Sequence, residues 1–313
     1  MTSARPSPPQ VEVLSRSTAR SLGVRVSLLL GQGYQRVFYD TYVSAGTASA
    51  AAVRSRAALS FAPPGSHVSH HTAAQLWGVW VPHQSRTHIS VPAGARRPRR
   101  AGVASHEHTV PPEVTTVAGL PVSTPAQLFL DLAGQLDLVD LVCVGDALIR
   151  RGLVTPEGLL GTARGWRGKG AVAARRAATL CRAGVDSAPE TRLRLLVVLA
   201  GLPEPTVNLI VRDEHGAWVL RFDLSYPGYK LALEYDGRQH AESDRQWQRD
   251  IDRREWMDRN GWRLVVVRSR GLWVEPAETL QRIRAAMVDV GMPVPAAFSP
   301  GWQAHFPGRE SAI

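Results

Sequence analysis

The sequence predicts a protein of mixed α+β or α/β class, in which a helical front part precedes a carboxyl-terminal αβββαβ domain. Three observations predict this class. Apolar spacings of the helix and strand types alternate along the chain, and the last third runs helix, three strands, helix, strand. The hydrophobic content of 44% over 313 residues is enough for a buried core, and the length predicts two or three domains.

The charge is unevenly divided along the chain. Residues 1–185 hold 20 of the 37 basic side chains but only 9 of the 27 acidic ones, so the whole excess of +10 lies in the front part. A cationic front half predicts a polyanion as partner. The alternative is a compositional one, in which arginine simply replaces lysine, as in high-GC bacterial proteomes.

The chain carries no sign of a membrane or secreted protein. Its longest apolar runs are broken before about 18 residues, and the first ten residues hold no apolar segment of the signal-peptide type. Two cysteines, Cys143 and Cys181, exclude a disulfide framework and a cysteine zinc site. We therefore expect a cytoplasmic protein without a membrane partner.

The amino-terminal segment has the outline of a small winged helix. Residues 1–12 are rich in proline and serine and predict a disordered tail. Residues 13–46 predict a helix, a turn at Gly23, a helix over Val24–Leu30 and a β-hairpin. A generic helical hairpin would show a similar pattern.

The middle region, residues 47–130, contains an unusual number of histidines. An alanine-rich helix over Ala48–Ala62 is followed by SHVSHHTAAQLWGVW, where Ser69 marks the start of the next helix. This stretch holds His67, His70 and His71, and His83 and His88 follow soon after it. A metal site is one interpretation of them. No carboxylate or thiol is interleaved and no zinc spacing is matched, so hydrogen-bonded core histidines are the favoured interpretation.

A compact basic loop follows, made of Arg96, Arg97, Arg99 and Arg100. It predicts contacts with a nucleic-acid backbone, against the alternative of a solvated loop. Helices are then expected over Thr124–Ala133, Leu136–Arg151 and Thr155–Ala183, the last broken at Gly165–Gly170. Residues 131–185 are accordingly interpreted as a helical bridge.

The domain over residues 186–290 carries the candidate chemistry, and residues 291–313 form a tail. Ser187 and Glu190 make a capping box for a helix to about Ala200. Strands follow over 207–211, 218–223 and 230–236, then a helix over 243–260, a strand over 262–268 and a last helix over 276–288.

Two acids are predicted to converge on the central hairpin of this domain. With the turn centred on Pro227-Gly228, Asp223 lies opposite Ala232 and diagonally beside Glu234, so the two carboxylates can share Mg²⁺, for which Mn²⁺ can substitute. Lys230 and Asp236 share the face of Glu234. His240 follows as a candidate acid, base or phosphate ligand. Acids in solvent at a strand end are the alternative.

These residues resemble a bacterial family. Roughly residues 190–288 are similar to domain-of-unknown-function family 559, which is related to very-short-patch repair endonucleases of the restriction-endonuclease-like superfamily. The matching residues are Ser187–Glu190, Arg221-Phe222-Asp223, Tyr226-Pro227, Lys230–Gly237, His240, Trp247, Asp250, Arg253 or Arg254, and Gly261-Trp262-Arg263.

The resemblance implies roles for these side chains. The superfamily signature is an acid followed by an acid-x-Lys triplet, which Asp223 and Glu234 match, whereas Asp236 stands at the lysine position and Lys230 lies four residues upstream of Glu234. Glu190 corresponds to a helix-borne supporting acid, with a purely capping role as the alternative. Arg253 and Arg254 would hold phosphates.

The front part resembles a second family. About residues 14–130 look like the winged-helix and adjoining region of abortive-infection antitoxins, which often precede such a nuclease-like domain in actinobacteria. The residues that carry this likeness are Ser17–Gly23, Tyr39–Val43, Ser69–Gly78, Ser123-Thr124-Pro125 and Leu130–Ala133. The first helix is shorter than is usual for that family.

The sequence thus predicts a DNA-binding, Mg²⁺-dependent endonuclease that uses Asp223 and Glu234 as metal ligands. Asp236, His240 or Lys230 would activate or position the attacking water. The alternative is a non-catalytic DNA-binding regulator or antitoxin with a degenerate nuclease fold and a toxin partner of unknown identity. RNA as the substrate is a third interpretation.

Overall fold

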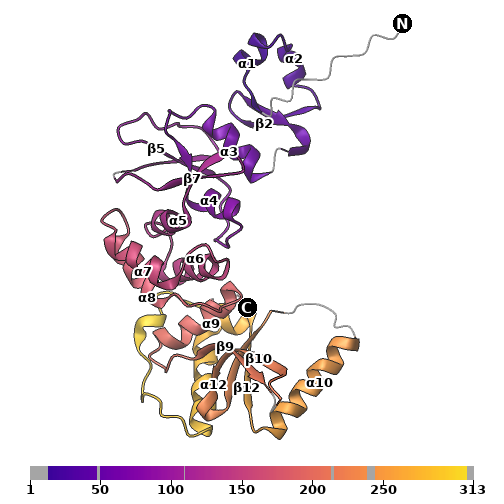
Figure 1. Ribbon diagram of the computed structural model, residues 1–313, viewed down its shortest axis with the longest axis vertical. Coiled ribbons are helices and arrows are strands. Elements are labelled where there is room, and N and C mark those ends of the chain that lie inside the picture. The colour runs from indigo at the N-terminus through magenta and orange to yellow at the C-terminus, as the bar shows by residue number, and fades with distance from the viewer. Residues whose placement is uncertain (1–12, 48–49, 109, 213–214, 238–243, 309–313) are drawn as a thin grey trace. The chain divides into compact units, whose positions relative to one another are not determined.

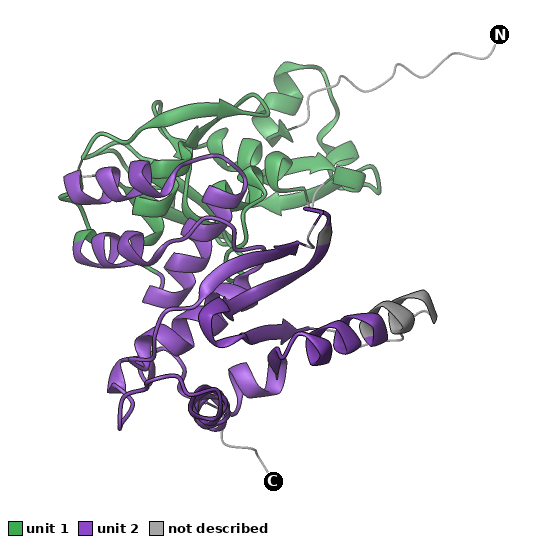
Figure 2. Ribbon diagram, turned by 60° about the horizontal axis from the view of Figure 1, so that its bottom comes forward, with its two compact units in different colours: residues 1–135, 166–171 green, residues 136–165, 172–313 purple. Residues whose placement is uncertain are grey.

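The computed structural model describes residues 13–47, 50–108, 110–212, 215–237 and 244–308, and it divides into two compact units. Unit 1 comprises residues 1–135 and 166–171, and unit 2 comprises residues 136–165 and 172–313. Figure 1 follows the elements along the chain, and Figure 2 shows the two units in green and purple.

Unit 1 begins with the predicted helix, turn, helix and hairpin. The elements are β1 (Val13–Leu14), α1 (Arg16–Ser21), α2 (Val26–Leu29), β2 (Tyr34–Phe38) and β3 (Thr41–Ser44), and the sheet order is β1-β3-β2. Ser15 caps α1 by accepting a hydrogen bond from the Thr18 amide. Phe38 and Val43 share a core with Ala57, Ile89 and Val103. The hairpin therefore packs against the middle region through these residues, while its Tyr42 forms a second small core with Leu14, Ala19 and Leu29.

The middle region is a five-stranded mixed sheet with helices packed on it. Its elements are η1 (Ala45–Thr47), α3 (Ala51–Leu59), β4 (His67–Val68), α4 (His70–Trp77), β5 (Thr87–Val91), β6 (Val103–Glu107), β7 (Val114–Val117), β8 (Leu120–Ser123) and α5 (Pro125–Leu132). The strand order is β6-β5-β4-β8-β7. Thr124 caps α5, and Gly78 ends α4 in the left-handed conformation at φ 63°.

Unit 2 opens with four helices, α6 (Leu138–Arg150), α7 (Pro156–Gly165), α8 (Ala171–Leu180) and α9 (Ala188–Leu199). The predicted break between α7 and α8 is present, and its residues 166–171 belong to unit 1. The predicted bridge over 131–185 is therefore not a separate body, because most of it packs with the C-terminal helices and strands, α6 against α9 above all.

The sheet of unit 2 confirms the order expected for this part of the chain. Its remaining elements are β9 (Thr206–Arg212), β10 (Trp218–Tyr226), η2 (Pro227–Tyr229), β11 (Leu231–Asp236), α10 (Asp244–Arg259), β12 (Arg263–Arg268), α11 (Ser269–Trp273), α12 (Pro276–Asp289) and η3 (Pro300–Trp302). The strand order is β12-β11-β10-β9, with β11 and β12 parallel and the other pairs antiparallel. The protein is thus of the α+β class, and β10 and β11 are the central strands.

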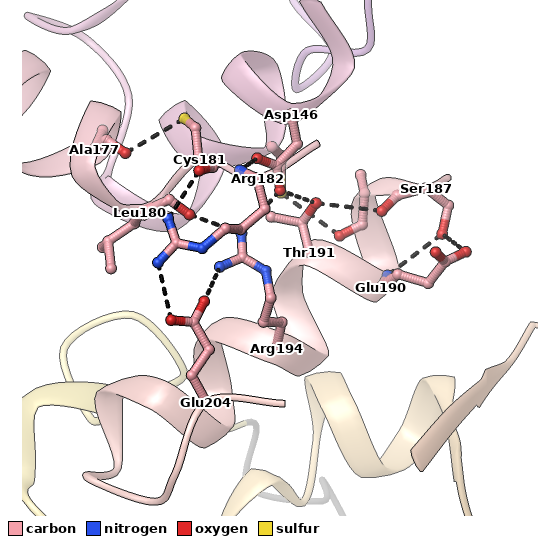
Figure 3. A network of polar contacts seen from close by, with 12 residues as sticks. Asp146, Ala177, Leu180, Cys181, Arg182, Ser187, Glu190, Thr191, Arg194 and Glu204 are labelled. Atoms are coloured by element: carbon pink, nitrogen blue, oxygen red, sulfur yellow. Dashed lines mark hydrogen bonds and ion pairs between the residues drawn. The ribbon is translucent and has the colours of Figure 1, made fainter. Parts of the chain in front are cut away.

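A buried ionic network joins α6, α9 and the residues that follow α8 (Figure 3). Arg194 is fully buried and donates to Asp146 at 2.9 Å, to the Leu180 carbonyl and to Glu204. Asp146 also accepts from the Arg182 amide and from the Thr191 hydroxyl. Arg194 and Asp146 thus bond to each other and to four further groups, and all of these residues belong to unit 2. The network therefore holds the helices of unit 2 together.

Residues 291–308 extend the core of unit 2 although they were expected to form a tail. Trp302 and Phe306 are buried, and the Ser299 amide donates to the Ala200 carbonyl at the end of α9. Within the described part of the chain, none of the helices has the length and apolar character needed to cross a lipid bilayer.

Candidate functional site

The two predicted acids lie on the two central strands of unit 2, Asp223 on β10 and Glu234 on β11. Leu224 pairs with Leu233 and Ser225 with Ala232, so Ala232 lies opposite Ser225. The expected pairing of Asp223 with Ala232 is therefore wrong. The turn includes η2 and ends on Lys230 in the left-handed conformation at φ 49°, which moves its centre by one residue and each partner by two.

An arginine from α10 fills the space beside these acids. Arg253 makes an ion pair with Glu234, donates to the Arg221 carbonyl at 3.2 Å and lies over the Phe222 ring. Asp223 instead accepts the Tyr235 amide at 3.2 Å. Burial raises the pKa of Asp223, and the Tyr235 amide and the Arg253 charge act against that shift. The pair of carboxylates is thus held by protein donors.

Glu190 lies close enough to Asp223 for the two charges to interact. Burial first and the Asp223 charge second raise the pKa of Glu190. Its carboxylate also completes the predicted capping box, because one oxygen accepts the Ser187 hydroxyl and the other accepts the Asp186 amide. The supporting and capping roles are therefore compatible in one side chain.

The other predicted site residues have partners of their own or lie outside the described residues. Lys230 precedes β11, and its ammonium donates to the Asn260 carbonyl at 2.9 Å, so it does not share the face of Glu234 as expected. Asp236 lies 3.8 Å from Arg268 on the neighbouring strand. His240 lies outside the described residues.

The donors and neighbours of the two acids determine whether they can hold a metal ion. Carboxylate oxygens suit Mg²⁺. However, among the residues that the structure describes, no three His, Cys, Asp or Glu side chains form a group that could hold a metal ion. Arg253 already neutralises Glu234. In this arrangement the two acids do not fit a divalent ion, and binding of Mg²⁺ or Mn²⁺ stays a prediction.

A polar cleft of about 650 Å³ opens beside Glu234 in unit 2. Arginines line it together with acids, and these are Arg253, Arg254, Arg268, Arg270, Arg282, Glu234, Asp236, Glu275 and Glu278. Several of the arginines are already bound: Arg270 pairs with Glu275 at 2.6 Å, and Arg282 donates to the Val266 carbonyl. Arg254 is exposed. The cleft is wide enough for a phosphate-bearing ligand but its charges are largely paired.

The predicted basic loop of unit 1 has one structural arginine and three exposed ones. Arg100 donates to Thr41 at 3.1 Å and to the Tyr39 carbonyl, and it stacks on the Phe61 ring with 3.8 Å to the centroid. Arg96, Arg97 and Arg99 are exposed. All four line a cavity of about 840 Å³. Arg100 thus anchors the loop while its neighbours are presented to solvent.

Six histidines of unit 1 form one buried or half-buried cluster where α4 meets β4, β5 and β6. It contains His67, His70, His71, His88, His106 and His108. The His70 and His106 rings stack at 3.7 Å, and His88 Nδ1 lies 3.0 Å from His106 Nε2. His67 Nε2 lies 3.1 Å from His108 Nε2. His83 is exposed and outside the cluster.

Not every histidine of this cluster is hydrogen-bonded, contrary to the favoured expectation. Both ring nitrogens of His71 and the Nε2 of His88 are buried and lack a partner among the described residues. His70 adopts φ 52°, a left-handed conformation rare for residues with a β-carbon. Burial lowers the pKa of His67 and of His106 to about 4 and that of His88 to about 3. All three are neutral at pH 7.

The part of the chain that holds the histidine cluster and the basic loop is similar to a known protein family. Residues 65–180 match the AbiEi antitoxin C-terminal domain. The matched segment contains the histidine cluster, the basic loop and α5 to α8, and it excludes Asp223 and Glu234. The expected antitoxin-like character is therefore confirmed for this part of the chain.

Relatives of the chain include two mycobacterial proteins. The uncharacterized proteins MT2308 and Rv2248 of Mycobacterium tuberculosis, from strains CDC 1551 / Oshkosh and H37Rv, are each 27% identical to it over 213 residues, which is 68% of this chain and 78% of theirs. The crystal structure of the RV2827C protein from the same species is 17% identical, with a TM-score of 0.38, over 63% of this chain and 78% of that one.

The AbiEi-like segment holds residues that the sequence reasoning did not select. His106 and His108 were not grouped with the other histidines, and neither were Trp166 and Lys169, which lie beside them. The available signal was weak: an alternating His-x-His at the end of a strand indicates two side chains on one face, but not what they face.

Proposed function

We propose that this protein is an antitoxin-type, DNA-binding regulator whose carboxyl-terminal unit has a nuclease-like but non-catalytic fold. The match of residues 65–180 to the AbiEi antitoxin C-terminal domain carries this proposal. An antitoxin role implies a toxin as partner, of unassigned identity, and a cytoplasmic location. The likeness of unit 2 to family 559 and to very-short-patch repair endonucleases belongs to the same proposal.

The DNA-binding part is supported by the charge of unit 1. The exposed guanidinium groups of Arg96, Arg97 and Arg99 line one groove, and the chain has a net charge of +10. Arg100 holds the loop that carries these three arginines in place through its contacts with Thr41 and Phe61. Guanidinium groups held in a fixed loop are suited to phosphate contacts, which supply sequence-independent affinity.

The first experiment measures duplex binding by fluorescence anisotropy at several salt concentrations. The variant with Arg96, Arg97 and Arg99 changed to Gln is expected to bind more weakly and to lower the slope of log K against log salt by about 0.9 per lost phosphate contact. The matched control changes Arg150, Arg151 and Arg164, three exposed arginines of unit 2, to Gln. Equal losses in both variants would show that only the net charge matters and would contradict a binding loop.

The non-catalytic part is supported by Arg253. Its ion pair with Glu234 opposes the binding of a cation between the two acids, and Lys230 is directed to Asn260 instead of the site. In a metal-dependent nuclease the ion stabilises charge on the phosphodiester. An arginine beside the acids favours holding a phosphate over cutting it.

An endonuclease acting on DNA or RNA is the second candidate function. The positions of Asp223 and Glu234 on the paired strands β10 and β11, with Glu190 close to Asp223, favour it. Asp223 and Glu234 would then hold Mg²⁺, which would supply charge stabilisation at the phosphodiester, and Asp236 or His240 would position the water.

The second experiment separates the two candidates. Plasmid, nicked and single-stranded DNA and an RNA are incubated with Mg²⁺ or Mn²⁺, and Mn²⁺ is titrated into the protein by calorimetry. We expect equal background cleavage by the wild type and by Asp223→Ala, and no Mn²⁺ binding that Glu234→Ala removes. Metal-stimulated cleavage that Asp223→Ala abolishes would overturn the non-catalytic proposal and establish the endonuclease.

A further inference from the structure

A second pocket lies within unit 1. It has a volume of about 250 Å³, and five segments supply its walls: α4 through His70, the basic loop through Arg97, the end of β6 and the residue after it through His106 and His108, α5 and the residues after it through Asp131 and Gln135, and residues 166–171. The last segment is drawn in green in Figure 2, between helices of unit 2 along the chain.

Two unpaired cations border this pocket. The Arg97 guanidinium and the Lys169 ammonium make no hydrogen bond or ion pair to any residue that the structure describes. Burial is the main cause that lowers the pKa of His106. Neighbouring histidines lower this pKa further, and so do the charges of Arg97 and Lys169. The two cations therefore lie near His106 on two different segments that line the same pocket.

The acids of the pocket are already engaged. Glu107 accepts the Gly94 amide at 2.8 Å. Asp131 accepts the Ser123 hydroxyl at 2.7 Å and the Gln127 amide at 2.8 Å, and burial raises its pKa to about 6. Neither acid is paired with Arg97 or Lys169, so an anion is the complement that the two cations lack.

The segment that carries Lys169 is rigid and presents an aromatic ring. The Trp166 indole donates to the Lys169 carbonyl at 3.0 Å and packs on Gly168. Gly170 has φ 77°, and a β-carbon there would lie 2.5 Å from the Ala133 backbone, so only glycine allows this approach to the end of α5. The lysine and the ring are thereby held in place before any ligand arrives.

We propose that this pocket binds a nucleoside monophosphate, either free or as the phosphorylated terminal nucleotide of a strand. Arg97 and Lys169 hold the phosphate, Trp166 stacks on the base, and Gln135 with the imidazoles of His106 and His108 provides polar contacts. Aromatic stacking recognises any base, and the small volume limits the site to one nucleotide. The cations at the rim disfavour a metal ion as the occupant.

The test uses the full-length protein and isothermal titration calorimetry. The probes are AMP, adenosine, inorganic phosphate, and a six-residue oligoadenylate with a 5′-phosphate or a 5′-hydroxyl. The variants are Arg97→Gln, Lys169→Gln and Trp166→Leu, and the matched control is Arg151→Gln, which removes an exposed charge from the end of α6. Circular dichroism verifies that each variant is folded.

We expect AMP to bind, adenosine and inorganic phosphate to bind more weakly, and Arg97→Gln and Lys169→Gln each to weaken AMP about tenfold. Preference for the phosphorylated oligonucleotide over AMP assigns the terminal nucleotide, and the reverse assigns the free ligand. Absence of AMP and 5′-phosphate binding, equal binding of adenosine and AMP, or equal effects of Arg151→Gln and Lys169→Gln would overturn the proposal. Because Arg97 and Lys169 lie on separate segments, misfolding of one variant leaves the other decisive.

Discussion

At the scale of single residues, two arginines show how position decides the role of one side-chain type. Arg194 is fully buried and donates to Asp146, Glu204 and the Leu180 carbonyl. Arg253 was expected to hold phosphates but pairs with Glu234. The pairs Arg194–Asp146 and Arg253–Glu234 are not apparent from the sequence, because their members are 48 and 19 residues apart. The sequence shows which charged residues are present, but not which of them form ion pairs in the fold.

The buried pair gives a prediction about stability. Asp146→Ala leaves the Arg194 charge buried with only Glu204 as its acid, so we expect the free energy of unfolding of unit 2 to fall by about 3–5 kcal/mol. The measurement is urea denaturation followed by circular dichroism. Glu255→Gln is the control, since its pair with Arg259 is exposed and is worth under about 1 kcal/mol. Comparable losses in the two variants would contradict this account of the network.

At the scale of elements, the strong periodic patterns of unit 2 were sufficient to predict the positions of most of its helices and strands. The helices and strands over 188–199, 206–212, 231–236 and 263–268 lie within about two residues of expectation, since each apolar run ends at a turn or cap. The short helix α11 was not predicted. The register of β10 and β11 was missed because the 3₁₀ turn and the left-handed Lys230 leave no sequence signal as strong as Pro227-Gly228.

The histidine cluster gives a prediction about how the stability of unit 1 depends on pH. Burial lowers the pKa of His67, His88 and His106, so below pH 6.5 the unfolded chain binds protons that the folded unit 1 does not. The stability of unit 1 is therefore complete above pH 6.5 and falls as the pH drops toward 4, by about 1.4 kcal/mol per pH unit for each such histidine.

The measurement is pulsed hydrogen exchange in urea after equilibration at pH 7.5, 6.0 and 5.0. Peptides from β5 are expected to lose protection at lower urea as the pH falls, and peptides from β11 in unit 2 serve as the internal control. His67→Gln together with His108→Gln should reduce the pH dependence of β5. An equal pH dependence of β5 and β11 would show that the cluster does not govern it.

At the scale of the whole molecule, the class and the uneven charge were predictable, whereas the division into units was not. The α+β class followed from the mixture of periodic patterns. The boundary expected near residue 186 follows a change in composition, but packing of α6 against α9 and the Arg194 network continue across it. Composition reports local preference, and unit boundaries depend on which distant helices pack together.

The short return of the chain into unit 1 at residues 166–171 has a consequence for how this protein can be divided. A gene fragment that stops after residue 135 encodes the five-stranded sheet but omits Trp166 and Lys169, and one that starts at residue 172 omits α6 and α7. No single cut separates the two units intact. Recombination during evolution, like subcloning in the laboratory, can therefore exchange either unit as an intact module only through paired breakpoints.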